Sequence, residues 1–320
     1  MTAAPPLQRN GVVVDETFAE AFPMKATRIV ITAHTLEWAR HAAVSATGFA
    51  TSVIACGCEA GIERELSPSE TPDGRPGVSV LMFSMSGKEL GKQLERRVGQ
   101  CVLTCPTTAV FAGLPRHAGS DVAALGKNLR FFGDGWQISK VIDGVRYWRV
   151  PVMDGEFVAQ EDTPVVKAVG GGNLLLLARD TDGALAASEA AVAAMKRLPN
   201  VVMPFPGGVV RSGSKVGSRY ANLNASTNDA FCPSLVGLVA HSELAGRGAA
   251  STEEIGCVME IVIDGLTEAD VAAAMRVGME AAIAIGPAGG LLRISAGNYG
   301  GKLGPFHFHL HKLLGAGDSP

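Results

Sequence analysis

The sequence carries no strong charge of either sign. Charged residues make up 18% of its 320 residues, and 28 Lys and Arg against 31 Asp and Glu leave a net charge of −3. A chain so close to neutrality has no global field that would attract nucleic acid or an anionic membrane. Any anionic ligand must therefore be bound by local basic groups.

Long hydrophobic runs and paired cysteines are also missing. The longest apolar stretch, near residues 279–292, contains Gly and Pro and is too short to span a bilayer. Residues 1–25 hold no apolar segment of the kind found in a secretory signal. The six cysteines are scattered and lack the spacing of zinc ribbons or thioredoxin motifs. We therefore expect reduced thiols in a cytoplasmic protein.

Two nucleotide-binding signatures are absent as well. The first expected strand, 28–32, is followed by Ala33 and His34 rather than by the glycine-rich turn of a Rossmann fold. The spacing from Gly208 resembles a phosphate-binding P-loop, but Ser214 intervenes before Lys215 and no Ser or Thr follows that lysine. The sequence therefore does not support nucleotide hydrolysis.

What the chain does contain is a large hydrophobic fraction, 47%, in segments that alternate between strand and helix periodicity. Each half approximates two β-α-β units, the pattern of a ferredoxin-like split βαβ domain. We predict an α+β fold with two such lobes, 1–153 and 154–320. The expected strands are 28–32, 51–55, 78–83, 128–132, 146–152, 173–178, 201–203, 257–263 and 291–295, and the expected helices are 35–47, 88–102, 184–198 and 267–285.

A short internal similarity favours a duplication. Residues 213–217 resemble residues 300–304 in their Gly-x-Lys-x-Gly pattern, and both segments are rich in glycine. Five residues make an internal duplication plausible without proving it.

The most informative side chain is Glu260, in the apolar run 257–263. Both faces of this run are apolar, so we expect a strand that is covered on both sides. Burying an ionised, unpaired carboxylate costs on the order of several kcal/mol, so the group is expected to keep its proton. A neutral carboxylic acid can donate a hydrogen bond to a developing oxyanion. The alternative is that Glu260 points to solvent or pairs with an arginine.

Two kinds of loop could bind a ligand. Glycine-rich segments, at 170–173, 207–217 and 297–302, let backbone N–H groups approach an anion, and Lys215 and Lys302 could add charge. The segment 225–233 places polar donors and acceptors beside an aromatic ring and a thiol, which suits a heterocycle with amide-like edges. Ordinary turns remain the alternative for both kinds of loop. The predicted ligand-binding residues of the second segment are Ser226, Thr227, Asn228, Asp229 and Phe231.

Three histidines alternate at His307, His309 and His311. On a strand they would share one face and could bind zinc. No Asp, Glu or Cys lies near them in sequence, and the phenylalanines between them favour packing. We therefore predict no metal site. A metal-dependent amidohydrolase that uses this cluster remains a rival hypothesis.

Taken together, these segments resemble one family, formylmethanofuran:tetrahydromethanopterin formyltransferase. The similarity runs from about residue 10 to residue 314, and many separate motifs occur in the family's order. They include DETFAEAF at 15–22, FFGDG at 131–135, ASTNDA at 225–230 and GGKLG at 300–304, together with 46–49, 70–78, 204–208, 214–218 and 295–298.

The resemblance implies a cytoplasmic homotetrameric acyltransferase of one-carbon metabolism, with two ferredoxin-like lobes related by duplication. It implies transfer of a formyl group between the amine of methanofuran and N5 of tetrahydromethanopterin, with both coenzymes as substrates and no prosthetic group. In methylotrophs the reaction would belong to the route from formaldehyde to formate. Glu260 matches the family's catalytic glutamate. From charge and glycine context we infer that Lys215, Arg211, Arg219 and Lys302 bind the anionic coenzyme tails.

An alternative keeps the fold without the chemistry. The chain could be a non-catalytic scaffold subunit that assembles with hydrolase subunits in a formyltransferase/hydrolase complex. Loss of Glu260 would have favoured this alternative, and Glu260 is present. Neither hypothesis requires nucleic acid or a membrane as a partner.

Overall fold

The computed structural model describes residues 7–213, 215–244 and 255–315, and its contacts divide the chain into two compact units. The first unit comprises Met1–Pro23 and Val169–Pro320, and the second comprises Met24–Ala168. Two long strands, β3 (Phe18–Thr32) and β12 (Val166–Ala178), run from one unit into the other. The division at residues 153 and 154 was drawn from sequence and stays a prediction; by contacts, the chain separates at 23/24 and 168/169.

The second unit is built on a split βαβ core. In chain order this core is β3, α1, β4, β5, α3 and β6, and its strands lie in the order β4-β5-β3-β6. β10 continues the sheet beside β6, followed by β9 and β8. The bounds are α1 (Leu36–Thr47), α2 (Val53–Cys56), β4 (Glu59–Leu66), β5 (Gly77–Ser84), α3 (Gly87–Arg97), β6 (Ala109–Ala112), β7 (Val122–Ala124), α4 (Gly126–Leu129), β8 (Ile138–Ile142), β9 (Val145–Val152), β10 (Gly155–Gln160) and β11 (Asp162–Pro164).

The first unit repeats this arrangement. Its core in chain order is β12, α5, β13, β16, α6 and β17, and the strands lie in the order β13-β16-β12-β17. Each core therefore has its first and third strands at the centre, which confirms two ferredoxin-like lobes of an α+β fold. The bounds are α5 (Thr181–Met195), β13 (Val201–Val202), β16 (Cys257–Gly265), α6 (Glu268–Ile285) and β17 (Leu291–Ser295).

Three groups of elements surround the core of the first unit. β2 pairs in parallel with β17, and β1 pairs with β2. A hairpin of β14 and β15 lies in the long insertion between β13 and β16. β18 pairs with residues 18–21 of β3, and α7 follows it. The bounds are β1 (Leu7–Arg9), β2 (Val12–Val14), β14 (Lys215–Val216), β15 (Ala225–Ser226), β18 (Phe306–His309) and α7 (Leu310–Leu313).

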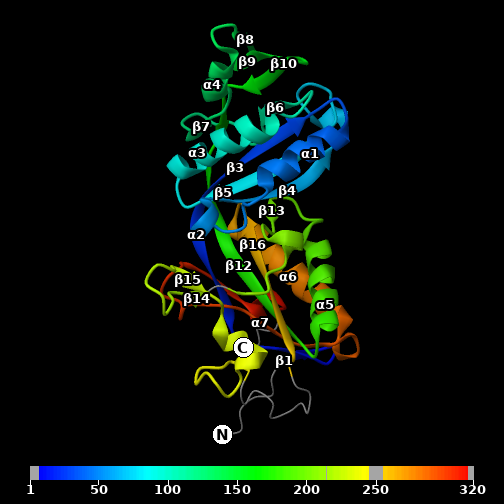
Figure 1. Ribbon diagram of the computed structural model, residues 1–320. Coiled ribbons are helices and arrows are strands. Elements are labelled where there is room, and N and C mark those ends of the chain that lie inside the picture. Colours follow the sequence, from blue (N-terminus) through cyan, green and yellow to red (C-terminus); the bar gives the residue numbers. More distant parts are fainter. Residues whose placement is uncertain (1–6, 214, 245–254, 316–320) are drawn as a thin grey trace. The chain divides into compact units, whose positions relative to one another are not determined.

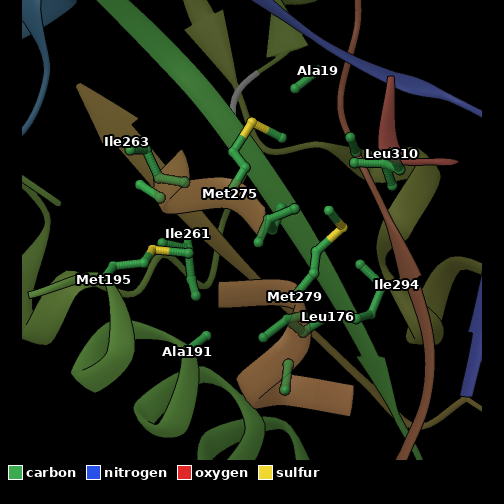
Figure 2. Packing of buried hydrophobic residues seen from close by; sticks show 14 of the residues in the cluster. Ala19, Leu176, Ala191, Met195, Ile261, Ile263, Met275, Met279, Ile294 and Leu310 are labelled. Carbon is green, nitrogen blue, oxygen red and sulfur yellow. The ribbon is translucent and has the colours of Figure 1, made fainter. Parts of the chain in front are cut away.

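Helices α5 and α6 lie side by side against one face of β12 and β16 (Figure 1). The core under these helices includes small residues such as Ala187, Ala191 and Ala274, which let the helices approach closely. Figure 2 shows Met195 of α5 beside Ile261 of β16, and Met279 of α6 beside Leu176 of β12 and Ile294 of β17. Helix α6 begins where the sequence predicted, because the Thr267 hydroxyl accepts a hydrogen bond from the Asp270 N–H at 3.1 Å.

Two of the expected strands are wrong. Residues 53–56 form the single helical turn α2, which is capped by the Ser52 side chain and ended by Gly57 in the left-handed region. Strand β4 follows α2 at Glu59–Leu66. Residues 126–133 are likewise helical. β-branched and aromatic residues favoured strands at both places, but the Ser52 cap starts a helical turn at 53–56, and backbone hydrogen bonds from Asn128 and Leu129 to Leu125 start the turn at 126–129.

The internal similarity of residues 213–217 and 300–304 does not relate the two lobes. Both segments belong to the first unit, one in the β13–β16 insertion and the other after β17. The duplication is carried instead by the repeated order of strands and helices. Among the described residues, no helix is both long and apolar enough to cross a bilayer.

Candidate active site

Glu260 lies in the middle of β16, on the sheet face opposite helices α5 and α6. Met259, Ile261 and Ile263 are buried, and the last two pack in the helical core, whereas Val258, Glu260 and Val262 are only partly buried. Successive residues of a strand point to opposite faces, so Glu260 projects away from the helices. Helices therefore cover only the opposite face of β16, and other segments of the chain cover the Glu260 face less completely.

A loop of the β13–β16 insertion covers this face. Val210 pairs with Glu260 through two backbone hydrogen bonds, of 2.7 and 2.8 Å. At Gly213 the chain has φ +59°, and a Cβ there would lie 2.8 Å from Cβ of Asn228 and 3.4 Å from Oε2 of Glu260. Glycine is required here because it alone tolerates both this conformation and this close approach. The loop thereby touches the carboxyl group of Glu260.

The resulting pocket is small. The pocket has a volume of about 20 Å³, which is room for about one water molecule. A group the size of a formyl oxygen fits this space, whereas a ring system would have to remain at its mouth. The lining residues are Leu175, Val210, Arg211, Ser212, Gly213, Asn228, Phe231, Cys232, Val258, Met259 and Glu260.

Burial alone raises the pKa of Glu260 from 4.5 to about 7. No residue in the described part of the chain hydrogen-bonds to its carboxyl group, so no partner compensates for the lost hydration. Near neutral pH about half of these groups are therefore protonated. In that form the group has a hydroxyl to donate and a pocket with room for one acceptor atom.

Three of the predicted ligand-binding residues line the Glu260 pocket: Arg211, Asn228 and Phe231. Arg211 is exposed, so its guanidinium is available to an anionic group at the mouth. Asn228 and Phe231 also line a second, larger cavity of about 420 Å³, which extends to residues 15–17 and 295–298. The two spaces therefore share a wall, and a ligand in the larger cavity would lie next to Glu260.

Four other predicted residues hold the insertion together. Asp229 accepts hydrogen bonds from Lys215 at 2.9 Å and from His241 at 3.1 Å, and these two partners lower its pKa to about 2. The Thr227 hydroxyl donates to the carbonyl of Ser212 and that of Ser226 to the carbonyl of Gly217. A role for these side chains in binding a ligand stays a prediction, because in this structure they bind the protein itself.

Arg219 and Lys302 are exposed and do not line the Glu260 pocket as described. The glycine-rich loop that carries Lys302 does surround an anion, but this anion is the protein's own Glu20. The N–H groups of Tyr299 and Gly301 donate to Oε2 of Glu20, and those of Leu303 and Gly304 donate to Oε1. These donors do not face an external anion, contrary to the expectation for this segment.

Sequence reasoning missed Glu20, Tyr299 and His241. Glu20 had the same signal as Glu260, a lone carboxylate in an apolar strand, and it lies in a motif of the family resemblance. Tyr299 lies within the glycine-rich segment 297–302, and no pattern in the sequence singles it out. His241 lies twelve residues from its partner Asp229, in a segment without periodicity.

The three alternating histidines do not share a strand face, since β18 ends at His309 and His311 belongs to α7. His307 and His311 lie within hydrogen-bonding distance of the backbone carbonyls of Gly304 and Val14. His307 and His309 pack against the ring of Phe18. In the described residues, no cluster of three or more His, Cys, Asp or Glu could hold a metal ion.

Comparison with known proteins identifies the family. The family model described as formylmethanofuran-tetrahydromethanopterin formyltransferase matches residues 7–152, and the model of its proximal lobe matches residues 155–313. The chain belongs to this formyltransferase family. A relative of that name from Methylococcus capsulatus is 67% identical over 305 residues, which are 95% of this chain and 99% of the relative. The protein is therefore an acyltransferase.

Two solved structures share the fold of this formyltransferase over nearly its whole length. One is the formyltransferase/hydrolase complex of Methylorubrum extorquens with methylofuran; the matching chain is 52% identical, with a TM-score of 0.90 over 97% of this chain and 99% of that one. The other is the formyltransferase of Methanosarcina barkeri, 46% identical, with a TM-score of 0.86 over 96% of this chain and 100% of that one.

Proposed function

We propose that this formyltransferase moves a formyl group between the amine of methanofuran, or an analogue of it, and N5 of tetrahydromethanopterin, with Glu260 as a neutral hydrogen-bond donor. The family supports the reaction. The pocket around Glu260 supports the role of this residue.

The transfer proceeds by direct attack without a covalent enzyme intermediate. The N5 lone pair forms a bond to the formyl carbon, and the π electrons of the carbonyl move onto its oxygen. The protonated carboxyl of Glu260 donates a hydrogen bond to this oxyanion. When the carbonyl re-forms, the bond from carbon to the methanofuran nitrogen breaks, and the proton lost from N5 ends on the departing amine.

One observation carries the assignment: burial raises the pKa of Glu260 to about 7, in a pocket with room for one small group. A carboxyl group with an ordinary pKa would be ionised at neutral pH, and its negative charge would oppose an oxyanion. Bringing two bound coenzymes together supplies a further part of the rate enhancement, up to roughly 7–11 kcal/mol in the best cases.

Glu260→Gln and Glu260→Ala test this role in a formyl-exchange assay with both coenzymes. Removing one oxyanion donor costs about 10²–10³ in kcat. Glu260→Ala should show this loss, whereas Glu260→Gln keeps the shape and an N–H donor and should lose less. Full turnover by Glu260→Ala would refute the oxyanion role, with equal KM values showing that both coenzymes still bind.

The coenzymes are proposed as substrates, with no prosthetic group. Arg211, at the mouth of the Glu260 pocket, is the best-placed cation for a coenzyme tail, and exposed Arg219 and Lys302 are further candidates. We further propose a homotetramer. In a methylotroph the same chemistry would serve the route from formaldehyde to formate.

Assembly with hydrolase subunits is a related proposal, because the chain of known structure that is 52% identical belongs to a formyltransferase/hydrolase complex. A non-catalytic scaffold would assemble without transferring formyl groups. The exchange assay on the purified chain separates the two roles, since a scaffold would show no exchange at any coenzyme concentration.

A further inference from the structure

The side-chain amide of Asn228 lies beside the carboxyl group of Glu260. Oε2 of Glu260 and Nδ2 of Asn228 lie 3.4 and 3.7 Å from the position that a Cβ at residue 213 would take. Both side chains also line the pocket of about 20 Å³ that has room for one small group. A carbonyl oxygen that enters this pocket therefore meets two polar groups, one from β16 and one from the insertion between β13 and β16.

The Asn228 amide is available to a ligand. Within the described residues, its nitrogen and oxygen have no hydrogen-bond partner. Of its two polar atoms, Nδ2 is the one that lies nearer to the gap at Gly213. An unpaired amide N–H at the wall of a pocket with room for one atom can donate to an acceptor that a ligand brings there.

The backbone of Asn228 is fixed from both sides. Its N–H donates to the Ser212 carbonyl at 2.9 Å, and its carbonyl accepts from the Phe231 N–H at 3.1 Å. The preceding residue is fixed as well, since the Thr227 hydroxyl donates to the same Ser212 carbonyl at 2.8 Å. A donor that is held in place before the substrate binds needs no reorganisation when charge develops in the reaction.

The other polar side chains of this pocket are less suited to donate to the same atom. The Cys232 thiol donates to the backbone carbonyl of Asn228 at 3.5 Å, and a thiol is a weak donor. Arg211 and Ser212 are exposed to solvent. Because the amide of Asn228 does not ionise, its hydrogen bond would persist at a pH at which Glu260 has lost its proton.

We propose that Asn228 is a second catalytic donor for formyl transfer: its side-chain N–H donates to the same carbonyl oxygen as the protonated carboxyl of Glu260. The oxyanion of the tetrahedral intermediate then receives two hydrogen bonds, which strengthen as negative charge develops on it. No bond to Asn228 forms or breaks, and no proton is transferred to it. The inference rests on the proposed function, because both side chains act on the oxygen of the transferred group.

Formyl-exchange kinetics of Asn228→Ala in the full chain test this proposal. On the acid plateau of the pH profile, kcat should fall by about 10²–10³, the usual cost of one oxyanion donor. Both KM values should stay near those of the wild type, since the hydrogen bond strengthens mainly in the transition state. Plateau values are compared because Glu260 is neutral there in each protein, so a change in its ionisation does not enter.

Two matched variants sharpen the test. Asn228→Leu keeps a similar size and leaves no space for a water molecule to replace the amide, so it should lose at least as much kcat as Asn228→Ala. Asn224→Ala removes an amide from the same insertion at an exposed position that lines neither cavity, and it should keep the kcat of the wild type. Urea unfolding of each variant shows whether it is folded.

A second measurement does not need turnover. Formylmethanofuran that is isotope-labelled in its formyl group is bound in the absence of the pterin, and the infrared stretch of its carbonyl is recorded. Hydrogen bonds to the oxygen lower this frequency. The lowering in the wild type should be smaller in Asn228→Ala and in Glu260→Ala, and smallest in the double variant.

An unchanged plateau kcat in folded Asn228→Leu would overturn the proposal, as would a loss confined to KM or an equal loss in Asn224→Ala. If the wild type transfers formyl groups but the carbonyl stretch does not respond to Asn228→Ala, the donor role fails and the proposed function stands. If the stretch responds but no protein transfers formyl groups, the proposed function fails and the donor role stands. A wild type that binds no formylmethanofuran would refute both.

Discussion

Two glutamates of the first unit are in opposite charge states because their partners differ. Glu20 is the less exposed to solvent of the two, yet four N–H donors keep its pKa at about 2. Glu260 has no such donors in the described chain, and its pKa rises to about 7. Low solvent exposure therefore does not by itself decide protonation; the hydrogen bonds that the charged form receives also count.

The charge state of Glu260 predicts the pH dependence of turnover. If the neutral acid is the active form, kcat should be constant below about pH 7 and fall about tenfold per unit above it. Glu260→Gln has no proton to lose, so its lower kcat should be flat from pH 6 to 9. Steady-state rates with both coenzymes saturating measure this, and a flat wild-type profile over the same range would contradict it.

The site was only partly predictable at this scale. A lone carboxylate in an apolar strand correctly marked Glu260 as unusual, but it marks Glu20 equally well. The difference lies in loop N–H groups about 280 residues away in sequence, which no local pattern reveals. Lys215 and Asp229 are predicted ligand-binding residues; in this structure they bind each other, and their role toward a ligand stays a prediction.

At the scale of elements, the first turn of α5 meets the turn before β17 backbone to backbone. A Cβ at Gly183 would lie 2.8 Å from the Cα of Gly290 and 3.0 Å from the carbonyl oxygen of Gly289. Neither neighbour is a flexible side chain, so the clash cannot be relieved by a rotamer change. The glycine is therefore needed to bring the helix against the sheet.

Gly183→Ala should lower stability by about 1–3 kcal/mol through overpacking, despite the better helix propensity of alanine. Gly91→Ala is the matched control, because it makes the same change inside α3, where the new Cβ would meet only the Cβ of Ala123 at 4.0 Å. That variant should gain up to about 1 kcal/mol. Urea unfolding compares the two, and a loss in both would point to a general intolerance of alanine.

For the whole molecule, alternation of strand and helix predicted the lobes well. The repeated order of first and third strands at the centre follows from two β-α-β units that share one sheet. The helix predicted for the long, periodic segment 267–285 is confirmed, because packing and capping favour the same conformation there. The strands predicted at 51–55 and 128–132 were wrong, because a helix of one turn is too short to show a periodic pattern in sequence. Contacts between residues 7–23 and the second half lie beyond any local pattern.

The two glutamates also predict how stability varies with pH. Glu20 has a lowered pKa, so its contribution is present above about pH 4.5 and is lost as pH falls toward 2. Glu260 has a raised pKa, so its contribution is present below about pH 4.5 and is lost as pH rises through 7. The stability that these two groups confer on the first unit should therefore be greatest near pH 4–5.

Glu260→Gln isolates the alkaline side of this dependence. The wild type must ionise a buried carboxyl above pH 7, and the amide does not, so the variant should be more stable at pH 8.5 by up to about 3 kcal/mol. At pH 4.5 both side chains are neutral and the two proteins should unfold at nearly the same urea concentration. Urea titrations at the two pH values, with tryptophan fluorescence and circular dichroism compared for coincidence, measure the difference. Equal midpoints at pH 8.5 would mean that Glu260 ionises without cost, and a group that ionises so easily could not serve as a neutral donor near neutral pH.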